Sequence, residues 1–192
     1  MEGTYYLSKE GVEEYVNMAK EVNSEPLIEK LKEHLAPQAM LLELGSGPGT
    51  DWRILSQTFT AVGSDYSMEF VKYLKRNNPA GTFLHLDAIT LDTFLRFDGV
   101  YANKVMQHLT DDEIKRSLEK HTVILNKGGV ICHSYWKGEG DEIHKGLFVN
   151  YQTEESLQAL YEEHFEVLKI ETYKEFEEED SLVIIAKVKR EE

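Results

Sequence analysis

The sequence predicts an α/β protein with a three-layer αβα fold. Its doubly wound, seven-stranded sheet is expected to be mostly parallel, with an antiparallel C-terminal hairpin strand. Two observations predict this class. From residue 40 to residue 163, short apolar runs alternate with segments of helical periodicity, which is typical of successive strand–helix units in a parallel sheet. Two further apolar runs, Phe165–Tyr173 and Ser181–Val188, follow without a helix between them and predict the closing hairpin.

Length and composition favour a single domain. The 192 residues are 41% hydrophobic and contain no obvious linker, so the chain can bury a substantial core. We expect residues 1–36 to form a helical N-terminal cap and residues 37–192 to form the core of the fold. The single cysteine, Cys132, cannot form an internal disulfide, and the first residues lack the apolar core of a secretion signal. No run approaches the ~20 apolar residues of a membrane span, and a cytoplasmic protein is expected.

The charge balance bears on partners. The chain has 21 basic and 35 acidic residues, a formal net charge of −14, which disfavours long-range attraction to phosphate backbones or anionic membranes. We therefore expect a small-molecule partner, and neither nucleic acid nor a membrane. No pattern in the sequence predicts the oligomeric state.

The segment before the first strand is predicted to be helical. Apolar residues recur at three- and four-residue steps between residues 9 and 35, and Pro26 suits the first turn of a second helix. Tyr5 and Tyr6 precede these helices. An aromatic pair on an N-terminal arm either caps a bound ligand or packs on the surface, so both tyrosines are candidate substrate contacts.

The most specific feature is a glycine-rich loop after the first strand. The apolar run Met40–Leu44 ends at Gly45, Gly47 and Gly49, and a helical segment, Asp51–Thr58, follows. Glycines here permit the positive φ of a tight turn and let a ligand approach the backbone. A dinucleotide-binding loop has the spacing G-x-G-x-x-G, whereas the third glycine here comes one position early. This spacing argues against a dinucleotide.

With Glu43 before the first glycine, the pattern E-x-G-x-G-x-G resembles motif I of the class I S-adenosylmethionine-dependent methyltransferases. The resemblance implies that S-adenosylmethionine is the cofactor and that Glu43 helps to receive its methionine ammonium. It implies that Gly45, Gly47 and Gly49 let the methionine and ribose portions pass close to the backbone. It also implies that helices ahead of the first strand close over the cofactor.

The second predicted strand, Thr60–Asp65, ends in an acid. A carboxylate at this place can accept both hydroxyls of a ribose. Its spacing from Gly49 matches the ribose-binding acid of the methyltransferase pattern. The alternative is that Asp65 or Ser67 caps the following helix. Tyr66 is a candidate cover for one face of the adenine.

The third predicted strand, Thr82–Ala88, carries Asp87 near its end. Because the carboxyl ends of neighbouring parallel strands meet at one crevice, Asp87 is expected close to Asp65. By resemblance to the family, Asp87 accepts the adenine amino group and Ala88 or Ile89 contributes a backbone amide to the ring. The alternative is that Asp87 only begins the turn toward Leu91.

The fourth predicted strand, Phe97–Asn103, resembles motif IV of the same family, and Asn103 is a candidate cofactor contact. The Asn/Asp-Pro-Pro-aromatic tetrapeptide of methyltransferases that modify base amino groups is missing here. Cys132 also lacks the neighbouring proline of a 5-methylcytosine nucleophile. Neither route of base methylation is therefore supported.

His108 is the candidate catalytic residue. Histidine titrates near neutral pH, and by resemblance this segment passes over the transferable methyl group. His108 is interpreted either as a general base or as a residue that shapes the loop or contacts the substrate. The other histidines show no paired or cysteine-linked spacing, so no metal site is predicted.

The C-terminal part is interpreted mainly as scaffold. The fifth strand, Val130–Trp136, leads into Lys137–Glu142, which is expected to be a flexible charged loop at the rim of the crevice. Lys137 and Tyr151, with Lys145, are candidates for binding an anionic small molecule, or are solvated. The acids of Glu175–Asp180 are expected at a hairpin tip, where they are solvated and discourage edge pairing.

The function that the sequence favours is an S-adenosylmethionine-dependent methyltransferase acting on a small-molecule acceptor. A general base is needed only if the acceptor arrives protonated. Two alternatives remain open at this point: a nicotinamide-dependent oxidoreductase on a similar sheet, and an S-adenosylmethionine-binding module without catalysis.

Overall fold

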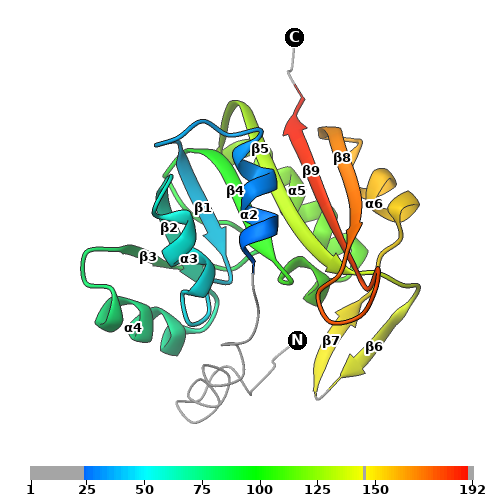
Figure 1. Cartoon of the computed structure of the whole chain (residues 1–192), viewed down its shortest axis with the longest axis horizontal. Helices are drawn as coiled ribbons and strands as arrows, with labels where there is room; N and C mark the ends of the chain where they lie inside the picture. The colour runs from blue at the N-terminus through cyan, green and yellow to red at the C-terminus, as the bar shows by residue number, and fades with distance from the viewer. Residues whose placement is uncertain (1–23, 145, 190–192) are drawn as a thin grey trace.

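The computed structural model describes residues 24–144 and 146–189 (Figure 1). Its large sheet has seven strands in the order β3-β2-β1-β4-β5-β9-β8. These strands, in chain order, are β1 (Met40–Leu44), β2 (Thr60–Asp65), β3 (Thr82–His85), β4 (Phe97–Asn103), β5 (Leu125–Trp136), β8 (Phe165–Tyr173) and β9 (Ser181–Val188). The predicted fold class is confirmed.

Strand direction follows from the connections. The pairs β1–β2, β2–β3, β1–β4 and β4–β5 are parallel, because a helix-containing crossover or a long loop joins successive strands. The last strand, β9, is antiparallel to both β5 and β8, as the two-run pattern predicts. Strand order reverses at β1 and β4, so the crevice where such sheets bind ligands lies at the carboxyl ends of these two strands.

Helices cover both faces of this sheet (Figure 1). One face carries α2 and α3, whose apolar residues pack on Tyr101 and Cys132, and the other carries α5 and α6. The helices are α2 (Glu25–Lys32), α3 (Thr50–Leu55), α4 (Met68–Asn77), the short 3-10 helix η3 (Met106–His108), α5 (Asp111–Ile124) and α6 (Glu154–Tyr161). None of the described helices is long and apolar enough to cross a membrane.

Local sequence signals explain where several helices begin. Pro26 lies in the first turn of α2, where its missing N–H costs no helical hydrogen bond. Thr110 and Thr153 form capping boxes at the starts of α5 and α6, as their sequences predict. Asp87 explains why β3 ends at His85, before the predicted Ala88. Its Oδ1 accepts a hydrogen bond of 2.6 Å from the amide of Ile89 and so fixes a turn.

Two differences from the predicted elements matter for the site. The segment expected to be a flexible charged loop contains β6 (Asp141–His144), which pairs with β7 (Leu147–Asn150) in a separate two-stranded hairpin. Its start is fixed by a hydrogen bond of 3.0 Å from the Tyr151 amide to the Gly140 carbonyl. Helix α3 ends at Leu55, three residues before the predicted Thr58. Residues 1–23 of the predicted N-terminal helical cap, which include Tyr5 and Tyr6, lie outside the described residues, as does Lys145.

Candidate functional site

A cavity of about 370 Å³ opens at the carboxyl ends of β1 and β4. Six described segments line it: the residue before α2, the glycine loop with the start of α3, the end of β4 with η3, the end of β5, the β6–β7 hairpin, and the connection between β8 and β9. The lining residues used below are Ser24, Glu43, Gly45, Gly47, Asp51, Asn103, Lys104, Gln107, His108, Trp136, His144, Leu147, Val149, Glu175 and Phe176. The structure thus brings five of the predicted site residues together in one cavity: Glu43, Gly45, Gly47, Asn103 and His108.

The glycines of the loop differ in their surroundings, and the contact of Gly49 with the cofactor stays a prediction. Gly49 is absent from the cavity lining and instead caps α3 with a left-handed φ of 79°. A Cβ added at Gly49 would lie 2.7 Å from Cδ2 of Leu74 on α4. Gly49 therefore serves close packing between α3 and α4, whereas Gly47 lines the cavity with a φ of 47°.

Glu43 is held by two serines beneath the loop. Its side chain is buried and accepts a hydrogen bond from the Ser46 hydroxyl, while its backbone carbonyl accepts one of 2.7 Å from Ser64 Oγ. Burial, and next the charge of Asp51, raise the pKa of Glu43 well above its usual value. The raised pKa favours a protonated Glu43 in the protein as it stands, and a cation close to it would reverse the shift.

Asp65 ties the glycine loop to the next strand. Its Oδ2 accepts a hydrogen bond of 2.9 Å from the Gly47 amide, and its Oδ1 accepts one of 2.8 Å from the Ser67 amide. Burial raises its pKa to about 6, although these two hydrogen bonds oppose the shift. The alternative cap, Ser67, does cap α4 by accepting from the Phe70 amide. Asp65 is buried beside the loop and is not part of the cavity lining.

The residues predicted to contact adenine lie further along the same edge of the sheet, after β2 and β3. The Tyr66 side chain is 58% exposed, and its carbonyl accepts a hydrogen bond of 2.8 Å from His85 Nε2. Asp87 is half-buried and accepts from backbone amides of the turn that follows it. The Ala88 carbonyl accepts a hydrogen bond of 2.6 Å from Ser117 Oγ on α5. None of these three described residues lines the cavity.

Asp51 is a cavity residue that the sequence analysis missed. It lies in the first turn of α3, and its Oδ2 accepts hydrogen bonds from Tyr101 Oη (2.8 Å) and from Asn103 Nδ2 (3.0 Å). The same Asn103 nitrogen donates to Ser24 Oγ, which connects α2 to the site. An acid in the first turn of a helix is usually interpreted as complementing the helix dipole, and for this reason Asp51 was overlooked. The sequence signal that could have identified it is its position two residues after the third glycine.

His108 is positioned by the hairpin that the sequence analysis missed. Its Nδ1 donates a hydrogen bond of 2.7 Å to the Phe148 carbonyl on β7. A carbonyl can only accept, so the proton of the neutral ring is on Nδ1 and Nε2 carries the lone pair. Burial lowers the pKa of His108, although the Phe148 carbonyl opposes the shift. The ring is therefore neutral near pH 7 and can accept a proton at Nε2.

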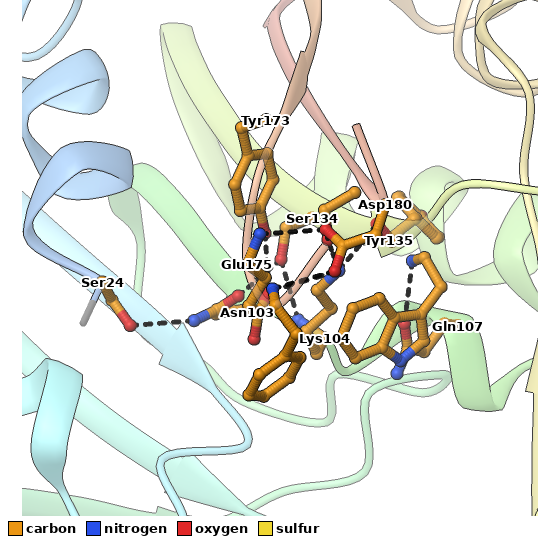
Figure 2. A network of polar contacts seen from close by, with 12 residues as sticks. Ser24, Asn103, Lys104, Gln107, Ser134, Tyr135, Tyr173, Glu175 and Asp180 are labelled. Atoms are coloured by element: carbon orange, nitrogen blue, oxygen red, sulfur yellow. Dashed lines mark hydrogen bonds and ion pairs between the residues drawn. The ribbon is translucent and has the colours of Figure 1, made fainter. Parts of the chain in front are cut away.

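A second polar network surrounds Lys104 at the end of β4 (Figure 2). Lys104 has a φ of 57°, which is uncommon for a residue with a side chain. Its Nζ donates to the Tyr135 carbonyl over 2.8 Å and to Ser181 Oγ over 2.7 Å. The same nitrogen lies 3.3 Å from Glu175 Oε2 and 3.5 Å from the centroid of the Trp136 ring. Burial lowers the pKa of Lys104 to about 8, although the Glu175 charge opposes the shift.

This network corrects the interpretation of the segment 175–180 as a solvated hairpin tip. The Glu175 side chain is only 11% exposed, and both Glu175 and Phe176 line the cavity. Asp180 accepts hydrogen bonds of 2.9 Å from the amides of Glu175, Phe176 and Glu177. Glu175 and Asp180 therefore hold a wall of the site, whereas the other acids of this segment face solvent.

Lys137 and Tyr151 are not among the cavity-lining residues. Lys137 Nζ lies 3.8 Å from Glu179 Oε2, and Tyr151 Oη donates a hydrogen bond of 2.6 Å to Glu142 Oε1. Their roles in substrate binding stay predictions. Among the described residues, no group of three or more histidines, cysteines or acids is placed to hold a metal ion.

Several solved structures with the same fold are those of methyltransferases. The 1,6-didemethyltoxoflavin-N1-methyltransferase of Burkholderia thailandensis, with bound 1,6-didemethyltoxoflavin and S-adenosylhomocysteine, has a TM-score of 0.79 and 20% identity, covering 94% of this chain and 85% of that chain. The N-methyltransferase NodS of Bradyrhizobium japonicum, in complex with S-adenosylhomocysteine, has a TM-score of 0.73 and 13% identity, covering 98% of this chain and 100% of that chain. At these identities the likeness shows the fold.

Sequence comparison points to the same family. Residues 41–129, from β1 into β5, match the model of a methyltransferase domain. In this part of its sequence and in its fold, the chain is similar to class I S-adenosylmethionine-dependent methyltransferases. An uncharacterised methyltransferase of Bacillus cytotoxicus is 32% identical over 93 residues, which are 47% of this chain and 44% of that protein. The match therefore spans less than half of the relative.

Proposed function

We propose that this chain transfers the methyl group of S-adenosylmethionine to a small-molecule acceptor. The single observation that carries the choice of ligand is the position of Asp51. In dinucleotide-binding folds, the pyrophosphate lies at the N-terminus of the helix after the glycine loop. Here Asp51 occupies the first turn of that helix and lines the cavity. Its carboxylate would repel a phosphate and attract an ammonium group.

The charges of the cavity fit S-adenosylmethionine, which carries an ammonium and a sulfonium group. Three acids, Glu43, Asp51 and Glu175, line the cavity. Among the described lining residues Lys104 is the one lysine or arginine, and it is paired with Glu175. The part of the cavity near the glycine loop is therefore suited to a cation. When bound, S-adenosylmethionine supplies an electrophilic methyl group on its sulfonium.

We assign the cofactor contacts in two groups along the edge of the sheet. Glu43, Gly45, Gly47, Asp51 and Asn103 would hold the methionine portion. The ribose and adenine portions would extend past β2 and β3, toward Asp65, Tyr66, Asp87 and Ala88. Asp65 keeps a free lone pair on each oxygen after accepting from Gly47 and Ser67, so it can still accept from ribose hydroxyls. Gly49 contributes by packing.

His108 is proposed to take the proton from a methyl acceptor that arrives protonated. The Phe148 carbonyl fixes the tautomer and leaves the Nε2 lone pair without a hydrogen bond among the described residues. A neutral imidazole next to the cavity can take a proton from a hydroxyl or an ammonium during transfer. An acceptor that is already ionised would need no such step, and His108 would then only shape the cavity.

Two observations support a small-molecule acceptor. The cavity is small, and described segments that are far apart in the sequence wall it in. The structurally similar 1,6-didemethyltoxoflavin-N1-methyltransferase of Burkholderia thailandensis holds 1,6-didemethyltoxoflavin in its structure. Tyr5, Tyr6, Lys137 and Tyr151 remain candidate acceptor contacts at its rim.

Calorimetric titration tests the cofactor assignment. The parent protein should bind S-adenosylmethionine and S-adenosylhomocysteine and should not bind NADH. Asp51→Ala should weaken binding of S-adenosylhomocysteine by about tenfold or more, because a charge-assisted hydrogen bond contributes ~1.5–3 kcal/mol. The matched control is Asp92→Ala, an exposed acid outside the cavity lining. Tighter binding of NADH than of S-adenosylhomocysteine would refute the assignment. Binding without turnover across a metabolite panel would identify a non-catalytic module.

A further inference from the structure

The acceptor end of the cavity has an aromatic wall made of Trp136 and Phe176. We propose that this wall selects planar, uncharged aromatic acceptors and that Lys104, acting through Glu175, is the residue that positions it. The inference rests on the proposed function, because it concerns the acceptor side of the same cavity.

The two rings that line this end of the cavity lie next to each other. Trp136 follows the last residues of β5 that pair with β4, and Phe176 comes from the β8–β9 connection. Their ring centroids are 5.9 Å apart and their planes are 30° from parallel. At this separation the rings contact each other and leave no space for a third ring between them. A ligand therefore meets a slanted aromatic wall, on which flat rings stack better than bulky saturated ones.

Phe176 is exposed although its segment is firmly held. Its side chain is 63% exposed and it lines the cavity. Asp180 fixes the backbone on both sides of it by accepting hydrogen bonds from the amides of Glu175, Phe176 and Glu177. Partial burial raises the pKa of Asp180, but these amides lower it more, to about 2, so the carboxylate stays charged. A phenyl ring that the described residues leave 63% exposed at the mouth of a cavity is suited to contact with an apolar ligand.

Lys104 connects this segment to the floor of the site. The three protons of its ammonium are directed to the Tyr135 carbonyl, Ser181 Oγ and Glu175. The ammonium also lies over the Trp136 ring, at 3.5 Å from the centroid. One cation thus holds both members of the wall: Trp136 directly, and Phe176 through its neighbour Glu175. Figure 2 shows Lys104 and Glu175 within the same polar network.

The same contacts argue for an uncharged acceptor. Because its donors are used within the protein, Lys104 has none left for an anionic substrate. The rest of this end is mostly apolar, with Leu147 and Val149 from β7 beside the neutral His108. Gln107, whose Oε1 accepts a hydrogen bond of 3.1 Å from the Trp136 amide, joins η3 to the wall.

Three probes of similar size test the proposal by ligand-observed NMR. These are 2-naphthol, which is flat and neutral, decahydro-2-naphthol, which is neutral but not flat, and 2-naphthoate, which is flat and anionic. The parent protein should bind 2-naphthol about fivefold more tightly than either of the other two. Equal affinity for the flat and the saturated alcohol, or no binding of 2-naphthol up to about 1 mM, overturns the proposal.

Variants distinguish a specific effect on the aromatic wall from a general loss of stability. Phe176→Ala and Lys104→Met should each reduce the preference for 2-naphthol over decahydro-2-naphthol to about twofold or less. Unfolding would weaken the binding of both probes alike, so the informative measurement is the ratio of the two affinities. Glu175→Gln tests the same connection if Lys104→Met does not fold. The controls are Phe94→Ala, an exposed phenyl away from the cavity, and Glu178→Gln, whose carboxylate pairs with Lys174 in the same loop.

A spectroscopic readout tests the position of Lys104. The chain has two tryptophans, Trp52 and Trp136, so Trp52→Phe leaves Trp136 as the reporter. In that background Lys104→Met should shift Trp136 emission, whereas Glu178→Gln should not; an unchanged spectrum contradicts the role of Lys104. None of these readouts needs the cofactor. Failure of S-adenosylhomocysteine to bind would refute the proposed function alone, whereas loss of probe selectivity would refute the wall alone.

Discussion

The Gly47 amide donates a hydrogen bond of 2.9 Å to Oδ2 of Asp65. This bond joins the glycine loop after β1 to the end of β2, two places that the sequence marks separately. The other oxygen of Asp65 accepts from the Ser67 amide at the start of α4. One carboxylate therefore organises the loop, the strand end and the next helix before any ligand binds.

Asp65→Ala should affect both affinity and stability. Removing the carboxylate takes away the proposed acceptor of the ribose hydroxyls, and binding of S-adenosylhomocysteine should weaken by ~2–4 kcal/mol. The midpoint of thermal unfolding should fall as well, because the Gly47 and Ser67 amides lose their acceptor. The control is Asp98→Ala, because Asp98 likewise accepts from a backbone amide, that of Met40, away from the cavity. An affinity within threefold of the parent would remove Asp65 from the cofactor site.

Gly49→Ala should destabilise the fold more than a matched glycine substitution. A side chain at Gly49 combines a left-handed φ of 79° with a Cβ placed 2.7 Å from Leu74 Cδ2. Gly140 has nearly the same φ, 76°, but nothing within 4 Å of an added Cβ. Gly140→Ala should therefore cost only the backbone strain of ~1–2 kcal/mol, and Gly49→Ala should cost ~1–3 kcal/mol more in urea unfolding. Equal losses would show that packing against α4 is unimportant.

Much of the fold could be predicted because its signals are local. The capping boxes of α5 and α6 and the apolar runs of the seven strands need only neighbouring residues. The β6–β7 hairpin was missed because the β6 residues Asp141–His144 are all exposed, so no alternation of buried positions marks a strand. β6 forms a strand because it pairs with β7, and no local pattern within β6 indicates this pairing.

The difference between local sequence signals and contacts between distant segments also explains which site residues were found. Glu43, Gly47 and Asn103 were found because they belong to short motifs. The pair of Lys104 and Glu175 was missed because it depends on contact between distant segments, and a run of acids reads locally as a solvated turn. Asp51 was missed because its contacts with Tyr101 and Asn103 exist only once β4 lies beside α3.

His108 should titrate below its usual pKa of about 6.5 and should carry its proton on Nδ1 near neutral pH. Burial disfavours the imidazolium, and the Phe148 carbonyl requires a donor at Nδ1. Nitrogen chemical shifts of labelled histidine rings between pH 5 and pH 8 report both properties, and His108→Gln assigns the signal. In methyl transfer to an acceptor that His108 deprotonates, the rate should rise with pH up to this lowered pKa and then level off. An Nε2–H tautomer, or a pKa above that of free histidine, would exclude Nε2 as the base.

His121 should make stability sensitive to acid. Its ring is fully buried, 5.1 Å from His133 between centroids, and burial lowers its pKa to about 4, while the Ser117 carbonyl opposes the shift. Between about pH 6.5 and pH 4 the unfolded chain binds a proton there that the folded chain does not, so the free energy of unfolding falls as pH falls.

Comparison with His121→Leu isolates this contribution. The parent should lose about 2 kcal/mol relative to the variant between pH 7 and pH 5 in urea unfolding. The raised pKa of Asp65 acts in the opposite direction in the same window, but both proteins share it, so it cancels in the difference. The control is His34→Gln, a histidine substitution at an exposed position, measured under the same conditions. A parent-to-variant difference that does not vary with pH would contradict the buried neutral state of His121.

The most direct test of the account is a crystal structure of the protein with S-adenosylhomocysteine. The account predicts that the ligand occupies the cavity at the ends of β1 and β4, with its amino group beside Asp51 and Asn103. The ribose hydroxyls should lie at Asp65, and the sulfur should face the compartment formed by His108, Trp136 and Phe176. A ligand bound elsewhere, or a cavity that takes up NADH and not S-adenosylhomocysteine, would contradict the account.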